Sequence, residues 1–306
     1  MDALLLDAAA TAARLPWAEL VAQVRAVLSD PAVTVPQRIV QPLAGGASLF
    51  VMPAADAQVA MTKLITFTPA NAGTPRPSIQ GDVVVFDVAT GTRRLVLDGP
   101  TVTARRTAAV SVLAAQLLGA APQGPLLVVG AGAQGRSHVE AFVEILGVRD
   151  VRIASRSASS ARSLADYARS LGAKASIVTD ADAALGDCPL VVTCTPANGI
   201  VLAALPRDDA FISAVGAFTP SMVEIAPPVC VHCAERGTVV VDTPEAVHEA
   251  GDLIQAGLDV AHFETLRDVL NRLKPARGPV LFKSCGWAGW DLAAARTALG
   301  VTPSAA

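Results

Sequence analysis

The chain has 306 residues, of which 52% are hydrophobic and 17% charged, and its formal net charge is −3. This length can bury a large core and form two domains, and a mildly acidic chain without basic runs gives no sign of a nucleic-acid-binding surface. The N-terminal residues carry Asp2 and Asp7 and no basic region, so we expect no signal peptide. No uninterrupted apolar run reaches the length of a membrane span, so we expect no membrane partner.

The five cysteines are an odd number, and three of them lie in or beside apolar runs. This usage is typical of a reducing compartment, so we expect a cytoplasmic protein. Cys230, His232 and Cys233 are close enough in sequence to suggest a zinc site. Since no second pair of ligands follows at finger spacing, we expect no bound metal.

The first hundred residues alternate short apolar runs with turns. Residues 16–28 carry apolar side chains at helical spacing, with Pro16 suited to the first turn. Strand-like runs occupy residues 37–43, 48–52, 59–66, 83–87 and 93–97, with a loop at 67–80 and a hairpin turn at 89–92. This pattern predicts a mostly antiparallel sheet with helices.

Residues 103–118 form the next predicted helix, with Thr103 as its N-cap. Arg105 and Arg106 would then lie in the first turn, where the helix dipole disfavours positive charge. Either they are solvated surface arginines or at least one of them binds an anion, and the sequence leaves both open.

A glycine-rich turn connects a short strand to a helix. The apolar run at 125–129 ends at Gly130, and Gly132 and Gly135 complete the pattern G-x-G-x-x-G before a helix over 136–146. In this pattern the first glycine permits the turn, the second lets a pyrophosphate approach the backbone, and the third allows close packing of helix on strand. The free N–H groups of the helix start then face the phosphates, so we expect a dinucleotide site.

Strands and helices alternate after this turn. Expected strands lie at 151–155, 176–178, 190–194, 210–215, 238–241 and 280–282, and expected helices at 159–172, 180–185, 244–256, 264–273 and 287–299. The alternation predicts an α/β fold with a doubly wound parallel sheet, a Rossmann domain over residues 119–285. Residues 1–118 and 286–306 would form a second, α+β domain, onto which the terminal helix returns.

The end of the second strand bears on the choice of cofactor. NAD-binding domains place an acid about 20 residues after the glycines, whereas Ser155, Arg156 and Ser157 stand here and the next acid is Asp166 inside the following helix. Serine and arginine side chains suit the 2′-phosphate of NADPH. We therefore expect NADPH, with NADH possible if Arg156 only stacks on the adenine.

Nearly the whole chain resembles the ornithine cyclodeaminase/mu-crystallin family. The matching segments are Pro36–Arg38, Val51–Ala54, Met61–Lys63, Pro69–Asn71, Val85–Gly91, Leu97–Gly99, Thr103–Ala109, the glycine loop, Thr193–Pro196, Glu249–Leu253 and Phe282–Ala288. Lys63, Arg106 and the Phe-Lys-Ser-x-Gly segment together make the match specific. The resemblance implies a Rossmann domain with a nicotinamide cofactor and a dimerising substrate domain, and hence a homodimer.

The resemblance also implies roles for individual residues. Arg38 and Arg106 would bind the carboxylate of an amino or imino acid, for which the guanidinium fork is suited, and Lys63 would lie beside the reacting C=N group. A solvated strand lysine is the alternative, but apolar neighbours favour burial and a lowered pKa for Lys63. Phe50, Met52 and Phe218 would line the substrate pocket. The residues expected at the cofactor are Thr107, Gly130, Gly132, Ala133, Gln134, Gly135, Ser155, Arg156, Ser157, Thr195, Pro196, Ser284 and Gly286.

Two departures from the cyclodeaminase pattern narrow the expected reaction. Phe50 and Phe218 stand where that pattern has acidic residues. Cyclodeamination must bind and activate a side-chain amine, so two lost carboxylates argue against it and favour a small, apolar, cyclic substrate.

We therefore expect an NAD(P)H-dependent imine reductase that reduces Δ1-pyrroline-2-carboxylate to proline, and by extension Δ1-piperideine-2-carboxylate to pipecolate. Lys63, directly or through water, would protonate the imine nitrogen. The sequence leaves the ring size open. Other readings are an ornithine cyclodeaminase or amino-acid dehydrogenase of the same family, or a crystallin-like protein that binds NADP(H) and ligand without turnover.

Overall fold

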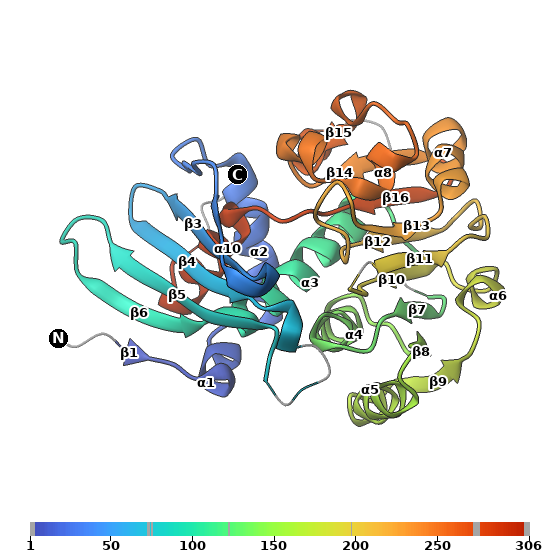
Figure 1. Cartoon of the computed structure of the whole chain (residues 1–306), viewed down its shortest axis with the longest axis horizontal. Coiled ribbons are helices and arrows are strands. Elements are labelled where there is room, and N and C mark those ends of the chain that lie inside the picture. The colour runs from blue at the N-terminus through green and yellow to red at the C-terminus, as the bar shows by residue number, and fades with distance from the viewer. Residues whose placement is uncertain are drawn as a thin grey trace. The chain divides into compact units, whose positions relative to one another are not determined.

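The computed structural model describes residues 4–71, 74, 76–121, 123–196, 198–271 and 276–302. The chain divides into two compact units (Figure 1). The first unit comprises Met1–Thr107 and Trp287–Ala306, and the second comprises Ala108–Gly286. The sequence predicts a division after residue 118, whereas the structure divides the chain eleven residues earlier, inside a helix.

The first unit is built on a six-stranded sheet, drawn in blue and cyan in Figure 1. Its strands are β1 (Leu4–Leu5), β2 (Ile39–Pro42), β3 (Ser48–Ala55), β4 (Val59–Phe67), β5 (Ile79–Asp87) and β6 (Arg93–Asp98). Their order is β1-β6-β5-β4-β3-β2, with β1 parallel to β6 and all other pairs antiparallel. The antiparallel sheet predicted from the alternating runs is therefore confirmed.

One face of this sheet is buried, and it places a lysine among apolar side chains. Because side chains alternate along a strand, the buried face receives Met52 from β3 and Val83 from β5, which both pair in register with Lys63 of β4. Lys63 is 1% exposed. A charged group is rarely buried without a partner, so the register alone requires an anion on this side of the sheet.

Among the described residues, α1 (Ala8–Ala13), α2 (Trp17–Ser29) and α10 (Ala288–Leu299) lie wholly in the first unit, and the next helix after the sheet begins in it at Gly99. The terminal helix α10 packs against α2 and against β3 and β4. Nearly all of its side chains are buried, which its run of alanines permits because small residues allow close approach. The predicted return of the terminal helix to the first domain is borne out by these contacts.

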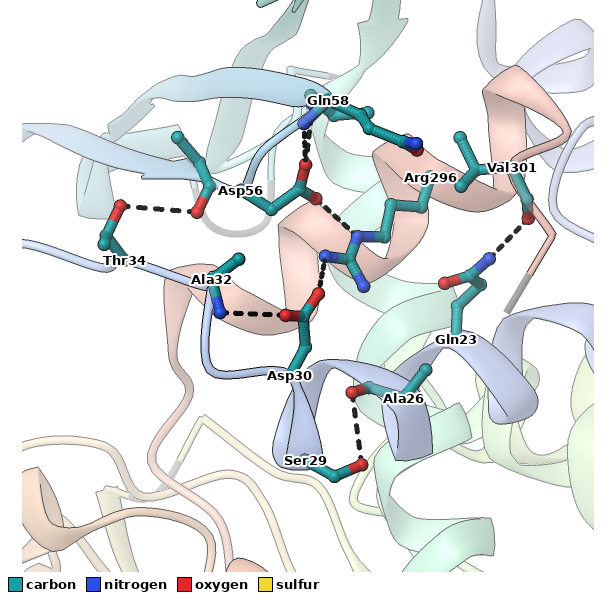
Figure 2. Close-up of polar contacts among 12 residues, drawn as sticks. Gln23, Ala26, Ser29, Asp30, Ala32, Thr34, Asp56, Gln58, Arg296 and Val301 are labelled. Carbon is teal, nitrogen blue, oxygen red and sulfur yellow. Dashed lines mark hydrogen bonds and ion pairs between the residues drawn. The ribbon is translucent and has the colours of Figure 1, made fainter. Parts of the chain in front are cut away.

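Arg296 fastens α10 to two other elements of the first unit (Figure 2). Its guanidinium donates to Asp56 Oδ2 in the β3–β4 turn and to Asp30 Oδ2 at the end of α2, both at 2.5 Å. The other oxygen of each carboxylate accepts backbone N–H groups, from Ala32 for Asp30 and from Gln58 for Asp56. Burial raises the pKa of Asp30, but these hydrogen bonds outweigh it and hold the pKa below its ordinary value.

The second unit is a doubly wound parallel sheet. Its strands are β7 (Leu126–Val129), β8 (Asp150–Ala154), β9 (Lys174–Val178), β10 (Leu190–Thr193), β12 (Phe211–Ala214), β14 (Thr238–Val241), β15 (Glu264–Thr265) and β16 (Val280–Lys283). The order is β15-β14-β16-β12-β10-β7-β8-β9. The strands from β7 to β9 extend the sheet toward one edge and those from β10 onward extend it toward the other, so the strand order switches between β7 and β10. Ligands bind at such a switch point, beyond the carboxyl ends of the strands. The predicted fold class is confirmed.

Helices α3 (Gly99–Leu117), α4 (Ala133–Ile145), α5 (Ala158–Ser170), α6 (Ala181–Leu185), α7 (Pro227–Arg236), α8 (Gly251–Gln255) and α9 (Leu266–Leu270) belong wholly or in part to the second unit, as does a strand pair, β11 (Asn198–Leu202) and β13 (Val223–Ile225). Among the residues that the structure describes, none of the helices is both long and apolar enough to cross a bilayer.

The predicted start of α3 is wrong. The helix begins at Gly99 rather than at Thr103, so Arg105 and Arg106 lie in its second turn and the dipole argument does not apply to them. Arg105 donates to the carbonyl of Leu15 and lies 3.9 Å over the ring of Trp17, which is a packing role. Arg106 does face an anion, as described below.

Other elements differ from the sequence expectation. Helices α1 and α7 and the strand pair β11–β13 were not predicted. The predicted helix over 244–256 is instead a 3₁₀ turn over Pro244–His248 followed by α8. The backbone leaves the helical conformation at Ala250, whose ψ is 68°, just before Gly251 packs against the carbonyl of Met222. The predicted helix over 264–273 begins with β15, and its last two residues lie outside the described residues, as do residues 72, 73 and 75 of the predicted loop.

Replacing Arg296 with leucine should lower the free energy of unfolding of the first unit by about 3 kcal/mol, because the buried carboxylate of Asp56 loses its partner. Urea unfolding followed by tryptophan fluorescence measures this, since all three tryptophans lie in the first unit. Arg94→Leu is the matched control: the exposed pair of Arg94 with Asp87 spans 3.7 Å, and its loss should leave the free energy of unfolding close to that of the wild type. Equal effects of the two changes would contradict the anchoring role of Arg296.

Candidate functional site

The first unit brings Lys63 and Arg106 together on one carboxylate, that of Asp291 in α10. Lys63 Nζ lies 2.8 Å from Asp291 Oδ2, and Arg106 Nε lies 3.2 Å from Asp291 Oδ1. All three side chains are buried, and Asp291 has no exposed surface. Two residues that are 43 positions apart in sequence are thereby held by a third from the far end of the chain.

The pKa of Lys63 is set by opposing influences. Burial is the largest influence and lowers its pKa, Asp291 raises it, and the neighbouring cations Arg106 and Arg38 lower it again. The pKa of Lys63 is thereby brought from 10.5 to about 8. An amine with this pKa is mostly protonated at neutral pH and can still release its proton, which is what a general acid needs.

Arg106 keeps one edge of its guanidinium available. Asp291 takes the Nε–H group, and within the described part of the chain neither Nη atom of Arg106 makes a hydrogen bond. A guanidinium can bind a carboxylate through its two Nη groups in bidentate fashion. The side chain is therefore equipped to hold Asp291 and an anionic ligand at the same time.

The remaining predicted substrate residues of the first unit lie around Lys63. Arg38, in the segment before β2, is half-buried and close enough to lower the pKa of Lys63. Phe50 and Met52 are two positions apart on β3 and therefore lie on the same face, and Met52 pairs with Lys63 in register. The lysine thus has a guanidinium and apolar side chains near it, a combination suited to a small apolar ring that carries a carboxylate.

In the second unit the glycine turn has the geometry that a dinucleotide needs. Gly130, at a φ of +119°, would place a Cβ 2.7 Å from the carbonyl of Cys194, and a Cβ on Gly135 would lie 2.1 Å from the carbonyl of Gly130. A Cβ on Gly132 would meet nothing within 4 Å. Only the middle glycine therefore faces open space, beside the first N–H groups of α4, which lack intrahelical partners. The residues fit a bound pyrophosphate.

Ala133 and Gln134 form the start of α4, which a buried histidine supports. His138 Nδ1 donates to the carbonyl of Gln134 at 2.8 Å, so Nε2 accepts from the hydroxyl of Ser111, which accepts in turn from Ser213. Burial lowers the pKa of His138 to about 4, so the ring is neutral at neutral pH. This chain of hydrogen bonds joins α3, α4 and β12 beneath the glycine turn.

The carboxyl end of β8 leads into Ser155, Arg156 and Ser157. Ser157 caps α5 by accepting the N–H of Ser160, and Arg156 is exposed and makes no hydrogen bond or ion pair among the described residues. Asp166, the next acid, pairs with Arg169 on α5 instead. No carboxylate of this segment opposes a phosphate at Arg156.

Glu224, which the sequence analysis missed, holds the loops after two neighbouring strands. Its carboxylate accepts the N–H and the hydroxyl of Thr195 at 2.6 and 2.8 Å, the hydroxyl of Thr193 and the N–H of Gly216. These loops follow β10 and β12, and they carry Thr195 with Pro196 and Phe218. The buried carboxylate therefore fixes the backbone on which three predicted site residues stand.

A buried ion pair, Lys283 with Asp252, contacts the backbone of Glu224, whose N–H donates to Asp252 Oδ1. Lys283, at the end of β16, lies 2.8 Å from Asp252 Oδ2 and donates to the carbonyl of Ala217. Burial lowers the pKa of Lys283, but Asp252 and the other facing acids outweigh it and raise the pKa above its ordinary value. Lys283 is thus a structural cation, unlike Lys63.

Asp242, also missed, organises the turn after β16. It accepts the hydroxyl of Ser284 and the N–H groups of Cys285 and Gly286, all within 2.9 Å. The donors of Ser284 and Gly286 are therefore engaged within the protein. Their predicted place beside the cofactor stays a prediction, as does that of Thr107, whose hydroxyl donates to the carbonyl of Thr103.

The cysteine segment has the properties of a core helix. Cys230 and Cys233 are buried on α7, and burial raises the pKa of both thiols. Among the described residues no three His, Cys, Asp or Glu side chains gather as a metal site.

The missed acids share one signal in the sequence: each is a single carboxylate in an otherwise apolar stretch. Asp291 stands in Ala-Gly-Trp-Asp-Leu-Ala-Ala-Ala, and Glu224 and Asp242 flank or interrupt apolar strands. Charged residues are seldom fully buried without partners, so such acids predict buried cations or clustered N–H donors nearby.

The sequence profile of the ornithine cyclodeaminase/mu-crystallin family matches residues 10–299. The chain belongs to this family. A Δ1-pyrroline-2-carboxylate reductase of Burkholderia multivorans is 40% identical over 298 residues, which cover 95% of this chain and 94% of that protein. A Δ1-pyrroline-2-carboxylate/Δ1-piperideine-2-carboxylate reductase of Azospirillum brasilense is 39% identical over 297 residues, 95% of this chain and 94% of the other.

The fold of this family member is also found in solved structures. The Δ1-pyrroline-2-carboxylate reductase of Thermococcus litoralis, determined in complex with NADH and L-proline, superposes with a TM-score of 0.87 at 23% identity. The superposition covers 97% of this chain and 96% of that one. The predicted family and fold are thereby confirmed.

Two glycine variants separate ligand contact from packing in the glycine turn. Gly132→Ala should leave the free energy of unfolding within about 0.5 kcal/mol of wild type, because its Cβ meets nothing, and should weaken NADH binding about tenfold or more by filling the space beside the phosphates. Gly135→Ala should instead destabilise the protein by about 2 kcal/mol. Fluorescence titration with NADH and thermal unfolding measure both quantities. Unchanged NADH binding by Gly132→Ala would contradict the assignment.

Proposed function

We propose that this protein is an NAD(P)H-dependent imine reductase that converts Δ1-pyrroline-2-carboxylate to L-proline and also accepts Δ1-piperideine-2-carboxylate. The observation that carries the proposal is the buried Lys63, with a pKa of about 8, grouped with Arg106 and Arg38. The relatives from Burkholderia multivorans and Azospirillum brasilense, which match 95% of the chain, are reductases of these imines.

In this proposal each side chain of the first unit has one task. The Nη edge of Arg106, together with Arg38, binds the substrate carboxylate and so fixes the ring. Lys63 donates a proton to the imine nitrogen, which makes the C=N bond a better hydride acceptor. The bound reduced nicotinamide supplies the hydride to C2. One proton and one hydride are thus added across C=N, and the amino acid leaves with its carboxylate unchanged.

The side chains beside Lys63 favour an imine over a diamine. Phe50 lies two positions from Met52 on the buried face of β3, where an apolar ring of five or six atoms would find apolar contacts. Cyclodeamination would require a carboxylate for the second amine of ornithine, and Phe50 offers none. Phe218, in the loop after β12, is half-buried and equally apolar.

The second unit supports a nicotinamide dinucleotide, and we propose NADPH as its preferred form. The open space at Gly132 and the N–H groups of α4 suit the pyrophosphate. At the end of β8, Arg156 offers a guanidinium without an internal partner among the described residues. Arginine pairs strongly with phosphate, so a 2′-phosphate would gain a contact that NADH lacks.

We propose a homodimer, as the family resemblance implies. Five large apolar side chains on β1, β2 and β4 of the first unit are more than 40% exposed and are available for contact with a second copy of the chain. They are Leu4, Leu5, Ile39, Val40 and Leu64.

Lys63→Met should lower kcat for imine reduction by about a hundredfold or more, since the proton donor is lost, and leave the Kd for NADPH unchanged. Oxidation of NADPH with Δ1-pyrroline-2-carboxylate, with L-proline identified as product, measures the first quantity, and fluorescence titration the second. Lys174→Met, at an exposed position of β9, is the control and should have wild-type activity. Full turnover in the Lys63 variant would remove the lysine from the mechanism.

The same assay discriminates the other readings of the family. Ammonia and proline formed from ornithine without net cofactor use would indicate a cyclodeaminase. NADPH-dependent ligand binding without oxidation would indicate a binding protein. Either result, with an inactive imine assay, would overturn the proposal.

Arg156→Ala should raise the KM for NADPH about tenfold and change the KM for NADH by less than about twofold, because only NADPH carries the 2′-phosphate. Arg169→Ala is the matched control: it removes an exposed arginine in the last turn of α5 and should alter neither KM. Equal effects of Arg156→Ala on both cofactors would show that the guanidinium stacks on the adenine and does not select NADPH.

A further inference from the structure

We infer that Asp291 is a positioning residue of this site, which keeps the Lys63 ammonium charged and aims the Nη edge of Arg106 at the substrate carboxylate. The inference rests on the proposed imine reduction. It assigns a role to a residue of the terminal helix that the sequence analysis did not single out.

The geometry of the carboxylate carries the inference. Each oxygen of Asp291 serves a different cation: Oδ2 lies 2.8 Å from Lys63 Nζ on β4, and Oδ1 lies 3.2 Å from Arg106 Nε on α3. One rigid carboxylate therefore sets the separation of the proton donor from the carboxylate-binding guanidinium. Because Nε is taken, Arg106 can meet a ligand only with its Nη groups, which fixes the side from which the ligand is held.

The charges around Lys63 give Asp291 a second effect. The groups that face the lysine are Asp291 from α10, Arg106 from α3 and Arg38 from the segment before β2. The side chains paired with it in register on β3 and β5 are Met52 and Val83, which are uncharged. Asp291 is thus the one group among these that favours the charged amine, against burial and two cations. Without it, the pKa of Lys63 would be lower, and less of the amine would carry the proton that it donates.

The same balance selects an anionic ligand. Lys63 and Arg106 are two cations on the single carboxylate of Asp291, so the cluster attracts one more negative charge. A second acid beside Arg106 would compete with an anionic ligand, and the loss of Asp291 would lower the pKa of Lys63. One carboxylate is the number that satisfies both requirements.

The packing of α10 on the first unit does not by itself require a carboxylate at position 291. The helix is already tied to α2 and to the β3–β4 turn by Arg296, through Asp30 and Asp56 (Figure 2). Burying an ion cluster is often no better for stability than apolar packing. A helix rich in alanine and leucine could pack on this sheet without a charge, so the carboxylate is explained by the chemistry of the site.

The test is the pH dependence of kcat/KM for Δ1-pyrroline-2-carboxylate, measured from about pH 6 to about pH 10. In the wild type, activity should fall as pH rises through about 8, where Lys63 loses its proton. In Asp291→Asn this limb should move to lower pH by about one unit or more, and KM should rise as Arg106 loses its orientation. The ionisation of the substrate is the same in both measurements, so the difference belongs to the enzyme.

Two further variants separate charge from structure. Asp291→Glu keeps the charge on a longer arm, so the limb should stay in place while kcat/KM falls. Asp56→Asn removes a carboxylate that also serves α10, through Arg296, but lies outside the Lys63 cluster. It should lower stability and leave the limb in place. If Asp291→Asn does not fold, Asp291→Ser removes the charge with a smaller side chain and carries the same expectation.

The outcomes distinguish the inference from the proposed function. An active wild type whose limb is unmoved in Asp291→Asn or Asp291→Ser overturns the charge effect, and wild-type kcat/KM in Asp291→Glu overturns the positioning effect. A wild type that does not reduce the imine at any pH overturns the proposed function itself. A limb that moves equally in Asp56→Asn would show that both variants act by loosening α10.

Discussion

A buried amine on the inner face of an antiparallel sheet is the constraint on which the first unit depends. Lys63 cannot remain charged among Met52, Val83 and the helix above it without an anion, and the anion comes from a helix at the other end of the chain. One residue, Asp291, therefore links three features: the packing of α10, the orientation of Arg106 and the protonation of Lys63. Buried ion pairs contribute little to stability on balance, which agrees with the role that we propose for this one in the chemistry of the site.

The second unit uses buried acids for a different purpose. Glu224 and Asp242 are surrounded by N–H and O–H donors from the loops that follow β10, β12 and β16. A parallel sheet exposes the carboxyl ends of its strands at one edge, and the loops there have no ladder to hold them. Each carboxylate accepts hydrogen bonds that neighbouring strands would otherwise supply and so keeps the loops in one conformation. A ligand at this edge therefore meets a preorganised surface.

The repeating features of the fold could be predicted from the sequence, because alternating and helical patterns follow directly from burial of one face. The glycine turn could be predicted too, since only glycine tolerates the approach of Gly135 to Gly130. Local signals failed where distant contacts decide: Gly99 rather than Thr103 starts α3, and a helical pattern is interrupted at Ala250, beside the close approach of Gly251 to Met222. Lys63 and Arg106 were singled out by resemblance to a family, but Asp291 was missed because its partners are over 180 positions away.

The placement of α10 has a consequence for how this protein is made. Synthesis proceeds from the N-terminus, and domains fold as units once their residues have emerged. The whole second unit, Ala108–Gly286, emerges before α10 does. Until then α10 does not cover the inner face of the first sheet, and Asp291 is not yet beside Lys63. The nascent chain can therefore complete its second unit, which carries the glycine turn, before α10 has joined the first unit. A chain that ends before α10 would lack Asp291, the carboxylate that favours the protonated form of Lys63.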